Sequence, residues 1–397
     1  MRILYLQTFP FWGSGSGTYA RHLASEIGRR HKVAILAPDE RPIDRAKLYT
    51  VKLPFPVAFT GHPEWPDCKF YTQLTNVEVS QVYKAFLDGT IAAVEDFKPD
   101  IIHVHHAFPL TWAAAFIKDL YGINFITTIH GSELPTIEKD RRYGRATYYS
   151  MFRTSRIIPN SGYTRDWFLR VFHGYFHEKC RVIPGGVDIA KFVYSESGAN
   201  QVDRELGLHG KPVVVFAGKI TKYKGVEYLI GAAKRIHGEV VILGDGPELS
   251  KLKQKAQSLG LTNVHWVGHL GAGVKKLVPY YSRADVFVAP SVWDEPLGLV
   301  ILEAMACNTP VVVTRKGGIP LAVKEGVNGL FIRPRNSEEI VEKVNKLLDN
   351  ESLRLKMGQN ARRIAEEKFS WETIGRKFEH IYEKFAKRNN NGVRLNK

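Results

Sequence analysis

Two carboxylates, Glu295 and Glu303, have a spacing that could bind a phosphorylated polyol. Glu295 follows a predicted strand at residues 285–290 and lies in a loop, whereas Glu303 falls in the first turns of the next predicted helix. Between them, Gly298 and Leu299 place backbone N–H groups at a helix N-terminus, where phosphate oxygens bind readily. Because carboxylates accept hydrogen bonds from sugar hydroxyls, the pair predicts a ligand with both hydroxyl and phosphate groups. The alternative is an exposed acidic pair that only caps a helix.

A lysine-rich loop at residues 218–225 supplies cationic groups. It reads Gly-Lys-Ile-Thr-Lys-Tyr-Lys-Gly, contains Lys219 and Lys224, and connects a predicted buried strand to a helix. Lysines in such a loop predict a phosphate site. Their ammonium groups are compact point charges that can stabilise a leaving diphosphate. The residue order of a Walker loop is absent.

A glycine-rich loop follows the first predicted strand. It reads Gly-Ser-Gly-Ser-Gly at residues 13–17, and Gly15 at its centre lets the backbone approach a ligand closely. The dinucleotide-binding order Gly-x-Gly-x-x-Gly is not matched, because Ala20 stands three residues after Gly17. A nicotinamide cofactor is therefore disfavoured.

Histidines gather at the ends of two predicted strands. His103, His105 and His106 end one strand, and His130 ends the next. A zinc site is the alternative interpretation of His103, His105 and His106, although no further ligand pattern accompanies them. His130 is expected to meet a substrate hydroxyl or carbonyl, with structural capping as its alternative.

The elements that must position these groups alternate along the chain. Apolar runs without two-fold alternation, separated by amphipathic helices, predict parallel sheets covered on both faces. The predicted strands are 2–6, 32–36, 101–105, 124–128 and 156–159, then 212–217, 240–243, 264–267, 286–289, 310–314 and 329–332. The clearest predicted helices are 18–29, 79–97, 112–120, 225–236, 248–259 and 299–307.

The two strand series predict two doubly wound domains. We place the break at residues 184–188 and in the polar stretch 195–209. The expected division is a first domain at 1–190, a second domain at 191–370, and a terminal helix from residue 371 that returns to the first domain. The tail 389–397 is expected to fray. Ligands of such sheets bind at the carboxyl ends of the strands.

Composition excludes several classes of protein. The chain has 397 residues, 44% of them hydrophobic, which excludes a disordered chain. The three dispersed cysteines favour a reducing cytoplasm over a disulfide scaffold, and no run approaches the ~18 apolar residues of a membrane span. The net charge is +16. This excess favours anionic ligands or peripheral contact with an anionic inner-membrane surface. A nucleic-acid partner is not expected, because no binding signature for one is found.

In combination, these motifs resemble family 4 of the retaining glycosyltransferases. The resemblance covers essentially the whole chain and rests on Glu295 to Glu303 as an E-x7-E element and on the lysine loop 218–225. Leu-Gly-Asp-Gly-Pro at 243–247, Pro-Gly-Gly-Val-Asp at 184–188 and Glu-Ala-Met-Ala at 303–306 complete it. The resemblance implies the GT-B fold, in which two Rossmann-like domains face each other across a cleft and a C-terminal helix crosses back to the first domain.

The family also implies a role for each matched residue. Glu295 and the backbone of Gly298 and Leu299 would hold the donor sugar and diphosphate, and Glu303 would bind the ribose hydroxyls. Lys219 and Lys224 would neutralise the leaving group, His130 would contact the donor sugar near the reacting carbon, and Gly15 would approach phosphate or acceptor. The resemblance thus implies an acceptor-binding domain at 1–190 and a nucleotide-sugar-binding domain at 191–370. Its catalytic residues would be His130, Lys224 and Glu295, and its donor-binding residues would be Gly15, Lys219, Lys224, Glu295, Gly298, Leu299 and Glu303.

The sequence departs from the family pattern at three positions. Lys219 stands where the family usually has Arg, which turns a bidentate phosphate contact into a point contact. Gly185 replaces the usual Asn, and Leu297 replaces a frequent Phe. None of these changes removes a charge that the reaction needs, although donor affinity or orientation could differ.

The expected reaction is metal-independent retaining transfer from a nucleotide-diphosphate sugar, without a cofactor. A sugar-nucleotide epimerase and a non-catalytic nucleotide-sugar-binding module are the alternatives. The acceptor is expected on the first domain, where the aromatic and proline-rich stretch 55–75 could stack on sugar rings or lie on lipid. The alternative is that these aromatics fold onto their own domain. The net charge favours a lipid-linked or phosphorylated acceptor.

Overall fold

The computed structural model describes residues 1–62, 65–270 and 274–386, and these divide into two compact units. Unit 1 comprises Met1–Asn160, Thr164–Ile183 and the chain from Gly375 onward, and unit 2 comprises Ser161–Tyr163 and Pro184–Ile374. The sequence predicts the corresponding boundaries after residues 190 and 370. The expectation of a frayed tail at 389–397 lies outside the described residues.

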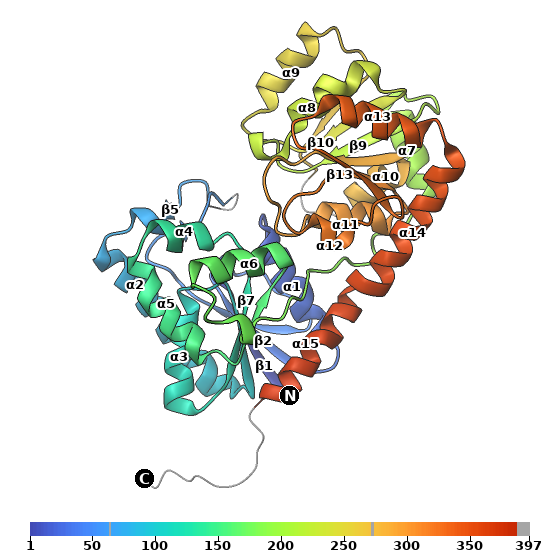
Figure 1. Cartoon of the computed structure of the whole chain (residues 1–397). Coiled ribbons are helices and arrows are strands. Elements are labelled where there is room, and N and C mark those ends of the chain that lie inside the picture. Colours follow the sequence, from blue (N-terminus) through green and yellow to red (C-terminus); the bar gives the residue numbers. More distant parts are fainter. Residues whose placement is uncertain (63–64, 271–273, 387–397) are drawn as a thin grey trace, which may run out of the picture. The chain divides into compact units, whose positions relative to one another are not determined.

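Unit 1 is built on a six-stranded parallel sheet with the order β3-β2-β1-β6-β7-β8 (Figure 1). Its strands are β1 (Arg2–Leu6), β2 (Lys32–Ala37), β3 (Ala46–Thr50), β6 (Ile101–His105), β7 (Phe125–Ile129) and β8 (Arg156–Pro159). Its helices are α1 (Gly15–Ile27), α2 (Asn76–Phe97), α3 (Leu110–Tyr121), α4 (Leu134–Lys139), α5 (Arg142–Arg153) and α6 (Gly162–Val171). A short pair, β4 (Val57–Ala58) and β5 (Lys69–Phe70), lies within the aromatic stretch 55–75.

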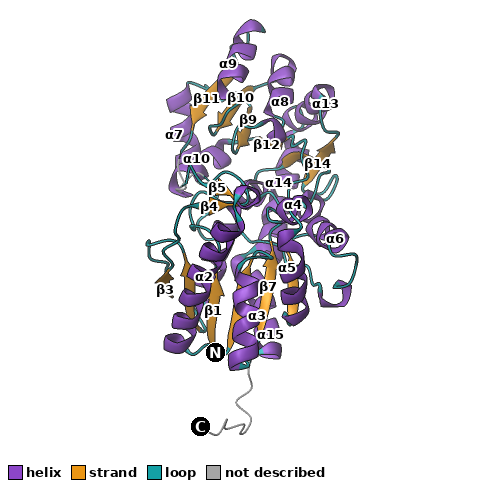
Figure 2. Cartoon of the chain, turned by 90° about the vertical axis from the view of Figure 1, so that its left-hand side faces the viewer, coloured by secondary structure: helices purple, strands orange, loops and turns teal. Residues whose placement is uncertain are grey.

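Helices cover both faces of this sheet, as its apolar strands require. Figure 2 shows α2, α3 and α5 in front of the strands. On the other face, α15 (Trp371–Phe385) joins unit 1 from Gly375 onward. There the Tyr382 hydroxyl lies 2.7 Å from both the Tyr5 hydroxyl and Nδ1 of His103. The C-terminal helix therefore packs on unit 1, as expected from the resemblance.

Unit 2 repeats the same topology with the order β11-β10-β9-β12-β13-β14. Its strands are β9 (Val213–Ala217), β10 (Glu239–Leu243), β11 (Val264–Gly268), β12 (Val286–Ala289), β13 (Val311–Thr314) and β14 (Gly329–Ile332). Its helices are α7 (Glu196–Leu206), α8 (Val226–Ala232), α9 (Leu249–Ser258), α10 (Val274–Arg283), α11 (Leu299–Ala306), α12 (Ile319–Ala322), α13 (Ser337–Leu348) and α14 (Glu351–Phe369).

The core of unit 2 follows from the pleat of its strands. Along β9, Val213, Val215 and Ala217 join an apolar cluster on one face, whereas Val214 and Phe216 join a second cluster on the other. Successive side chains of a strand point to opposite faces, so a continuous apolar run fills two cores. The fold class predicted from the sequence, two doubly wound α/β domains, is confirmed.

One part of the predicted boundary is wrong. The break was expected to include the polar stretch 195–209, but this stretch contains α7 and belongs to unit 2, which resumes at Pro184. Ser195 caps this helix by accepting a hydrogen bond from the Gly198 N–H at 3.1 Å. Val202 is buried, and Gly198 lies so close to Pro279 of α10 that an added Cβ would meet it at 3.2 Å. A narrow apolar face on a polar helix accounts for the misassignment.

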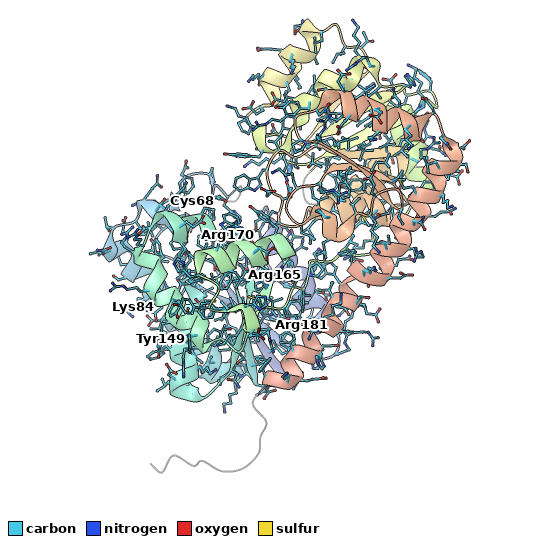
Figure 3. All side chains as sticks on the ribbon, in the orientation of Figure 1. Cys68, Lys84, Tyr149, Arg165, Arg170 and Arg181 are labelled. Atoms are coloured by element: carbon cyan, nitrogen blue, oxygen red, sulfur yellow. The ribbon has the colours of Figure 1, made fainter. Side chains whose placement is uncertain are left out.

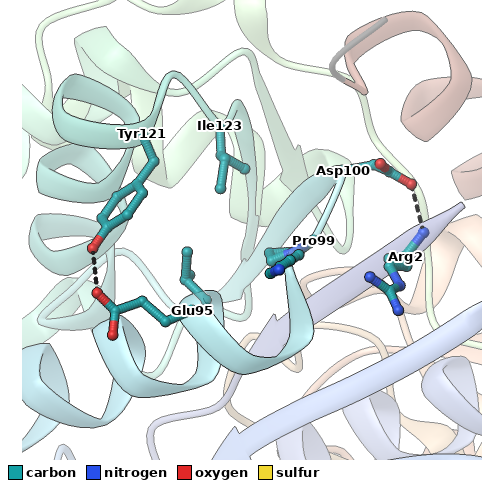
Figure 4. Close-up of a pocket in the computed structure, with 8 residues that line it drawn as sticks. Arg2, Glu95, Pro99, Asp100, Tyr121 and Ile123 are labelled. Atoms are coloured by element: carbon teal, nitrogen blue, oxygen red, sulfur yellow. Dashed lines mark hydrogen bonds between the residues drawn. The ribbon is translucent and has the colours of Figure 1, made fainter. Parts of the chain in front are cut away.

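In both units the strand order reverses between two central strands, β1 and β6 in unit 1 and β9 and β12 in unit 2. Such switch points are where doubly wound sheets bind ligands, in the loops after the strands. A cavity of about 680 Å³ lies at the opposite, amino-terminal edge of the sheet of unit 1. Figure 4 shows its lining, where the Arg2 N–H donates to Asp100 and the Tyr121 hydroxyl donates to Glu95. It contains none of the predicted site residues.

Candidate active site

The lysine loop and the E-x7-E segment meet at the switch point of unit 2. The loop 218–225 follows β9, and Glu295 lies in the loop that follows the adjacent strand β12. The backbone N–H groups of Val292 and Trp293 donate to the Tyr223 carbonyl at 2.9 and 3.3 Å. Gly225 has φ 67°, and an added Cβ would lie 2.1 Å from the Pro290 carbonyl oxygen. Glycine is therefore required where these two loops pack together.

Lys224 and Glu295 form an ion pair at this point. Both side chains are largely buried, with 29% and 13% of their surface exposed, and Ser291 Oγ lies 3.5 Å from Glu295 Oε1. The ammonium of Lys219 is exposed and forms no hydrogen bond or ion pair within the described part of the chain. The ammonium of Lys224 is thus held by the carboxylate of Glu295, whereas that of Lys219 projects into solvent.

The start of α11 lies between the two glutamates. Gly298 is its N-cap with φ 75°, and Leu299 is its first residue. The first N–H groups of a helix have no partner inside the helix and attract anions. The loop after β13 supports this segment, since the Gly318 N–H donates to the Glu295 carbonyl at 2.6 Å.

Glu303 lies one turn further along α11 and is only partly accessible to solvent. The buried Tyr281 hydroxyl donates to its Oε2 at 2.8 Å. Removal of the carboxylate from water raises the pKa of Glu303 to about 7, and the hydrogen bond from Tyr281 opposes this rise. Near neutral pH, Glu303 can therefore change between a carboxylate and a neutral acid.

In unit 1, His130 follows β7 at the carboxyl edge of the sheet and is 6% exposed. Its Nε2 lies 3.0 Å from Nδ1 of His105, and its backbone N–H donates to Oε1 of Glu133 at 3.1 Å. Burial lowers the pKa of His130 to about 3 and raises the pKa of the fully buried Glu133 to about 7. His130 is therefore a neutral imidazole at physiological pH.

The glycine loop of unit 1 begins α1. Ser14 is the N-cap and accepts a hydrogen bond from the Gly17 N–H at 3.1 Å. An added Cβ on Gly17 would lie 2.6 Å from the Phe11 carbonyl oxygen, so the fold requires this glycine. An added Cβ on Gly15 would meet no atom within 4 Å. Gly15 thus leaves open space at the N-terminus of α1.

The zinc alternative finds no support in the described residues, which hold no group of three or more His, Cys, Asp or Glu side chains placed to bind a metal ion. Both ring nitrogens of His103 are already used, Nδ1 with Tyr382 and Nε2 with the Thr128 hydroxyl at 2.7 Å.

Comparison with known proteins agrees with this geometry. Residues 13–191 match the family described as Glycosyltransferase Family 4, and residues 200–364 match that described as Glycosyl transferases group 1. The chain is 32% identical over 313 residues to the alpha-maltose-1-phosphate synthase of Mycolicibacterium smegmatis, covering 72% of this chain and 79% of that protein. The chain belongs to glycosyltransferase family 4.

A second relative and a solved structure extend the comparison. An uncharacterized glycosyltransferase of Methanocaldococcus jannaschii is 30% identical over 299 residues, covering 72% of this chain and 75% of that protein. The crystal structure of Anabaena Alr3699/HepE in complex with UDP superposes with a TM-score of 0.78 at 20% identity, covering 97% and 100% of the two chains. The fold is GT-B, and the protein is a glycosyltransferase; the comparisons do not favour the epimerase or the binding module.

Of the predicted site residues, the structure brings Lys224 and Glu295 into direct contact. Gly298, Leu299 and Glu303 follow on α11, and His130 and Gly15 lie at the carboxyl edge of unit 1. Sequence reasoning missed the side chains of Tyr281 and Glu133, and it considered His105 as a zinc ligand and not as a partner of His130. Glu133 had a local signal, since it stands three residues after His130 in His-Gly-Ser-Glu.

Proposed function

We propose that this protein transfers a sugar from a nucleotide-diphosphate sugar to a hydroxyl acceptor with retention of anomeric configuration. The observation that carries the proposal is the Lys224–Glu295 ion pair at the switch point of unit 2, directly before the N-terminus of α11. Lys224, Lys219 and the N–H groups of α11 would stabilise the diphosphate as its bond to the anomeric carbon breaks. This stabilisation needs no metal ion and no cofactor.

The two carboxylates have separate roles in the proposal. Glu295, with the backbone of Gly298 and Leu299, would hold the sugar and the diphosphate, and Glu303 would accept hydrogen bonds from the ribose hydroxyls. Anabaena Alr3699/HepE, a structural neighbour at 21% identity, is described in complex with UDP-glucose, which supports a donor of this class. His130 would contact the sugar near the reacting carbon, and Gly15 would leave room for phosphate or acceptor.

Retention of the anomeric configuration follows from the face of the anomeric carbon on which the new bond forms. The bond between the anomeric carbon and the phosphate oxygen breaks, the acceptor oxygen bonds to the same face of that carbon, and the acceptor proton passes to the departing phosphate. A double displacement would need a free carboxylate nucleophile. Glu295 is paired with Lys224 and Glu303 with Tyr281, which favours the single-face route.

The acceptor is proposed to bind unit 1 and to be lipid-linked or phosphorylated, at the cytoplasmic face of the inner membrane. All three cysteines are free thiols, as a reducing compartment maintains them. No helix in the described ranges is long and apolar enough to cross a membrane. Contact with a membrane would therefore be made through a surface of the protein.

One segment of unit 1, residues 139–181, carries exposed side chains that suit an anionic membrane. This segment carries 10 Lys and Arg against 3 Asp and Glu, whereas the rest of residues 1–190 carries 13 against 15. Three of its aromatic side chains, Tyr149, Phe152 and Tyr175, are 58%, 61% and 68% exposed. Figure 3 shows Tyr149 on α5, and Arg165 and Arg170 on α6. Exposed aromatics within a basic field favour binding to anionic lipid headgroups.

Sedimentation with vesicles tests this contact. The protein should pellet with phosphatidylglycerol vesicles and not with phosphatidylcholine vesicles, and Phe152→Ser combined with Tyr175→Ser should reduce the bound fraction severalfold. Leu355→Ser is the matched control, because Leu355 is 54% exposed on α14 of unit 2. Equal loss with the control, or equal binding to both vesicles, would contradict the proposed surface.

The reaction itself is tested with a panel of nucleotide sugars. A substrate donor should raise the melting temperature, because ligand binding stabilises the folded state. Free nucleoside diphosphate should then appear only when an acceptor is added. Conversion of the donor to its epimer without acceptor, or binding without turnover for every acceptor class, would overturn the proposed transfer.

A further inference from the structure

His105 and His130 form a hydrogen-bonded pair of imidazoles in the interior of unit 1. Nδ1 of His105 lies 3.0 Å from Nε2 of His130, with ring centroids 5.3 Å apart and planes inclined by 19°. Tyr19 of α1 and His106 pack against His130 at centroid distances of 5.1 and 4.8 Å. Within the described residues, His105 is the only side chain that forms a hydrogen bond with the His130 ring.

This hydrogen bond fixes where protons can lie. Burial holds the pKa of both imidazoles below its usual value, so each ring carries one proton. In a hydrogen bond between two neutral imidazoles, one ring donates and the other accepts, and the choice sets the tautomer of both.

The surroundings of His105 decide between the two arrangements. Its second nitrogen, Nε2, is buried and has no hydrogen-bond partner among the residues that the structure describes. If His130 donated, the proton of His105 would reside on this nitrogen as a buried, unpaired N–H group. If His105 donates, the nitrogen is only an unpaired acceptor. Unpaired donors are the rarer case in folded proteins, and burying one without a partner is unfavourable.

We infer that His105 donates its Nδ1 proton to Nε2 of His130 and so keeps the proton of His130 on Nδ1, as a donor toward an oxygen of the bound sugar. The inference rests on the proposed contact between His130 and the donor sugar. His105 acts through His130 and is therefore a positioning residue. It sets both the orientation of the ring and which nitrogen carries hydrogen.

Nuclear magnetic resonance of the full-length protein labelled with ¹⁵N-histidine measures this tautomer directly, without substrate. The His130 ring should show a protonated Nδ1 and an unprotonated Nε2, assigned by the loss of its signals in His130→Phe. His106→Phe is the matched control. It replaces a ring that packs on His130 without a hydrogen bond to it, so the tautomer of His130 should not change. A protonated Nε2 on His130 in the unaltered protein would overturn the inference.

Two variants of one shape separate hydrogen bonding from packing. His105→Asn keeps a donor near the position of Nδ1, and His105→Leu fills similar space without one. With the donor selected by the panel, His105→Leu should lower kcat about 10- to 100-fold and change the donor KM less than about threefold. His105→Asn should recover most of the lost turnover. Equal kcat in both variants would refute the positioning role.

The proposed contact between His130 and the sugar can fail independently of the inference about His105. If His130→Phe retains full turnover, the contact with the sugar is refuted, and the tautomer measured in the unaltered protein still decides whether His105 is the donor of the pair. If His130→Phe loses turnover but both His105 variants match the unaltered protein, the inference fails and the proposed function stands.

Discussion

If Glu303 accepts hydrogen bonds from the donor ribose, as proposed, the affinity for the donor should depend on pH in a way that follows from the pKa of this residue. Burial raises the pKa of its carboxyl to about 7. A protonated acid accepts hydrogen bonds from ribose hydroxyls less well than a carboxylate does. Because the folded-state pKa is raised, the carboxylate predominates only above pH 7 and is lost as the pH falls. The donor KM should therefore rise on acidification.

The size of this change follows from the titration of one group. With a pKa of about 7, Glu303 is about 90% ionised at pH 8 and about 10% ionised at pH 6. If only the ionised form binds the donor, the apparent KM should be about tenfold higher at pH 6 than at pH 8. Both phosphates of the donor are esterified, so the donor adds no titration of its own in this range.

The assay is initial-rate kinetics at saturating acceptor between pH 6 and pH 8. Glu303→Gln cannot ionise and keeps the side-chain shape, so its donor KM should exceed that of the unaltered protein even at pH 6 and should not follow this titration between pH 6 and pH 8. A flat donor KM in the unaltered protein, or a pH dependence that persists in Glu303→Gln, would refute the assigned role.

Three further predictions follow from the same geometry. Lys224→Ala should lower kcat at least about 100-fold, since losing a stabiliser of leaving charge typically costs about 3–4 kcal/mol, and near-normal turnover in the folded variant would contradict the assignment. Activity should persist in excess EDTA, and complete loss restored by Mn²⁺ or Mg²⁺ would contradict the metal-free mechanism. Burial raises the pKa of Glu133 to about 7. The free energy of unfolding of unit 1 should therefore fall as the pH rises from about 4.5 to 7, by about 3 kcal/mol in total. Glu133→Gln should remove that loss, measured by hydrogen exchange of β6 and β7 in urea at pH 5 and pH 8, and an unchanged pH dependence would count against it.

The repeated strand–helix pattern was sufficient to predict the fold. The strands β1, β6 and β12 begin and end at the predicted residues, because a buried parallel strand is a continuous apolar run. The edge strand β3, at Ala46–Thr50, was missed because its residues are half-exposed and include Lys47. Helix α7 was missed because most of its surface is polar.

The candidate site was only partly predictable. The motifs located Lys224, Glu295 and Glu303, but local sequence could not show that Lys224 and Glu295 pair across two loops. Tyr281 lies 22 residues from Glu303 in sequence, and only the packing of α10 beside α11 brings its hydroxyl to the carboxylate. Side chains that hold a catalytic residue from another element leave no signal in spacing alone.

The central claim, metal-free transfer with retention at the site of Lys224 and Glu295, is tested most directly by the anomeric configuration of the first product. Proton magnetic resonance during turnover of an α-linked nucleotide sugar, in EDTA, distinguishes the two anomers of the transfer product. We predict an α-linked product formed together with free nucleoside diphosphate, and almost no product from Lys224→Ala. A β-linked first product would contradict the account.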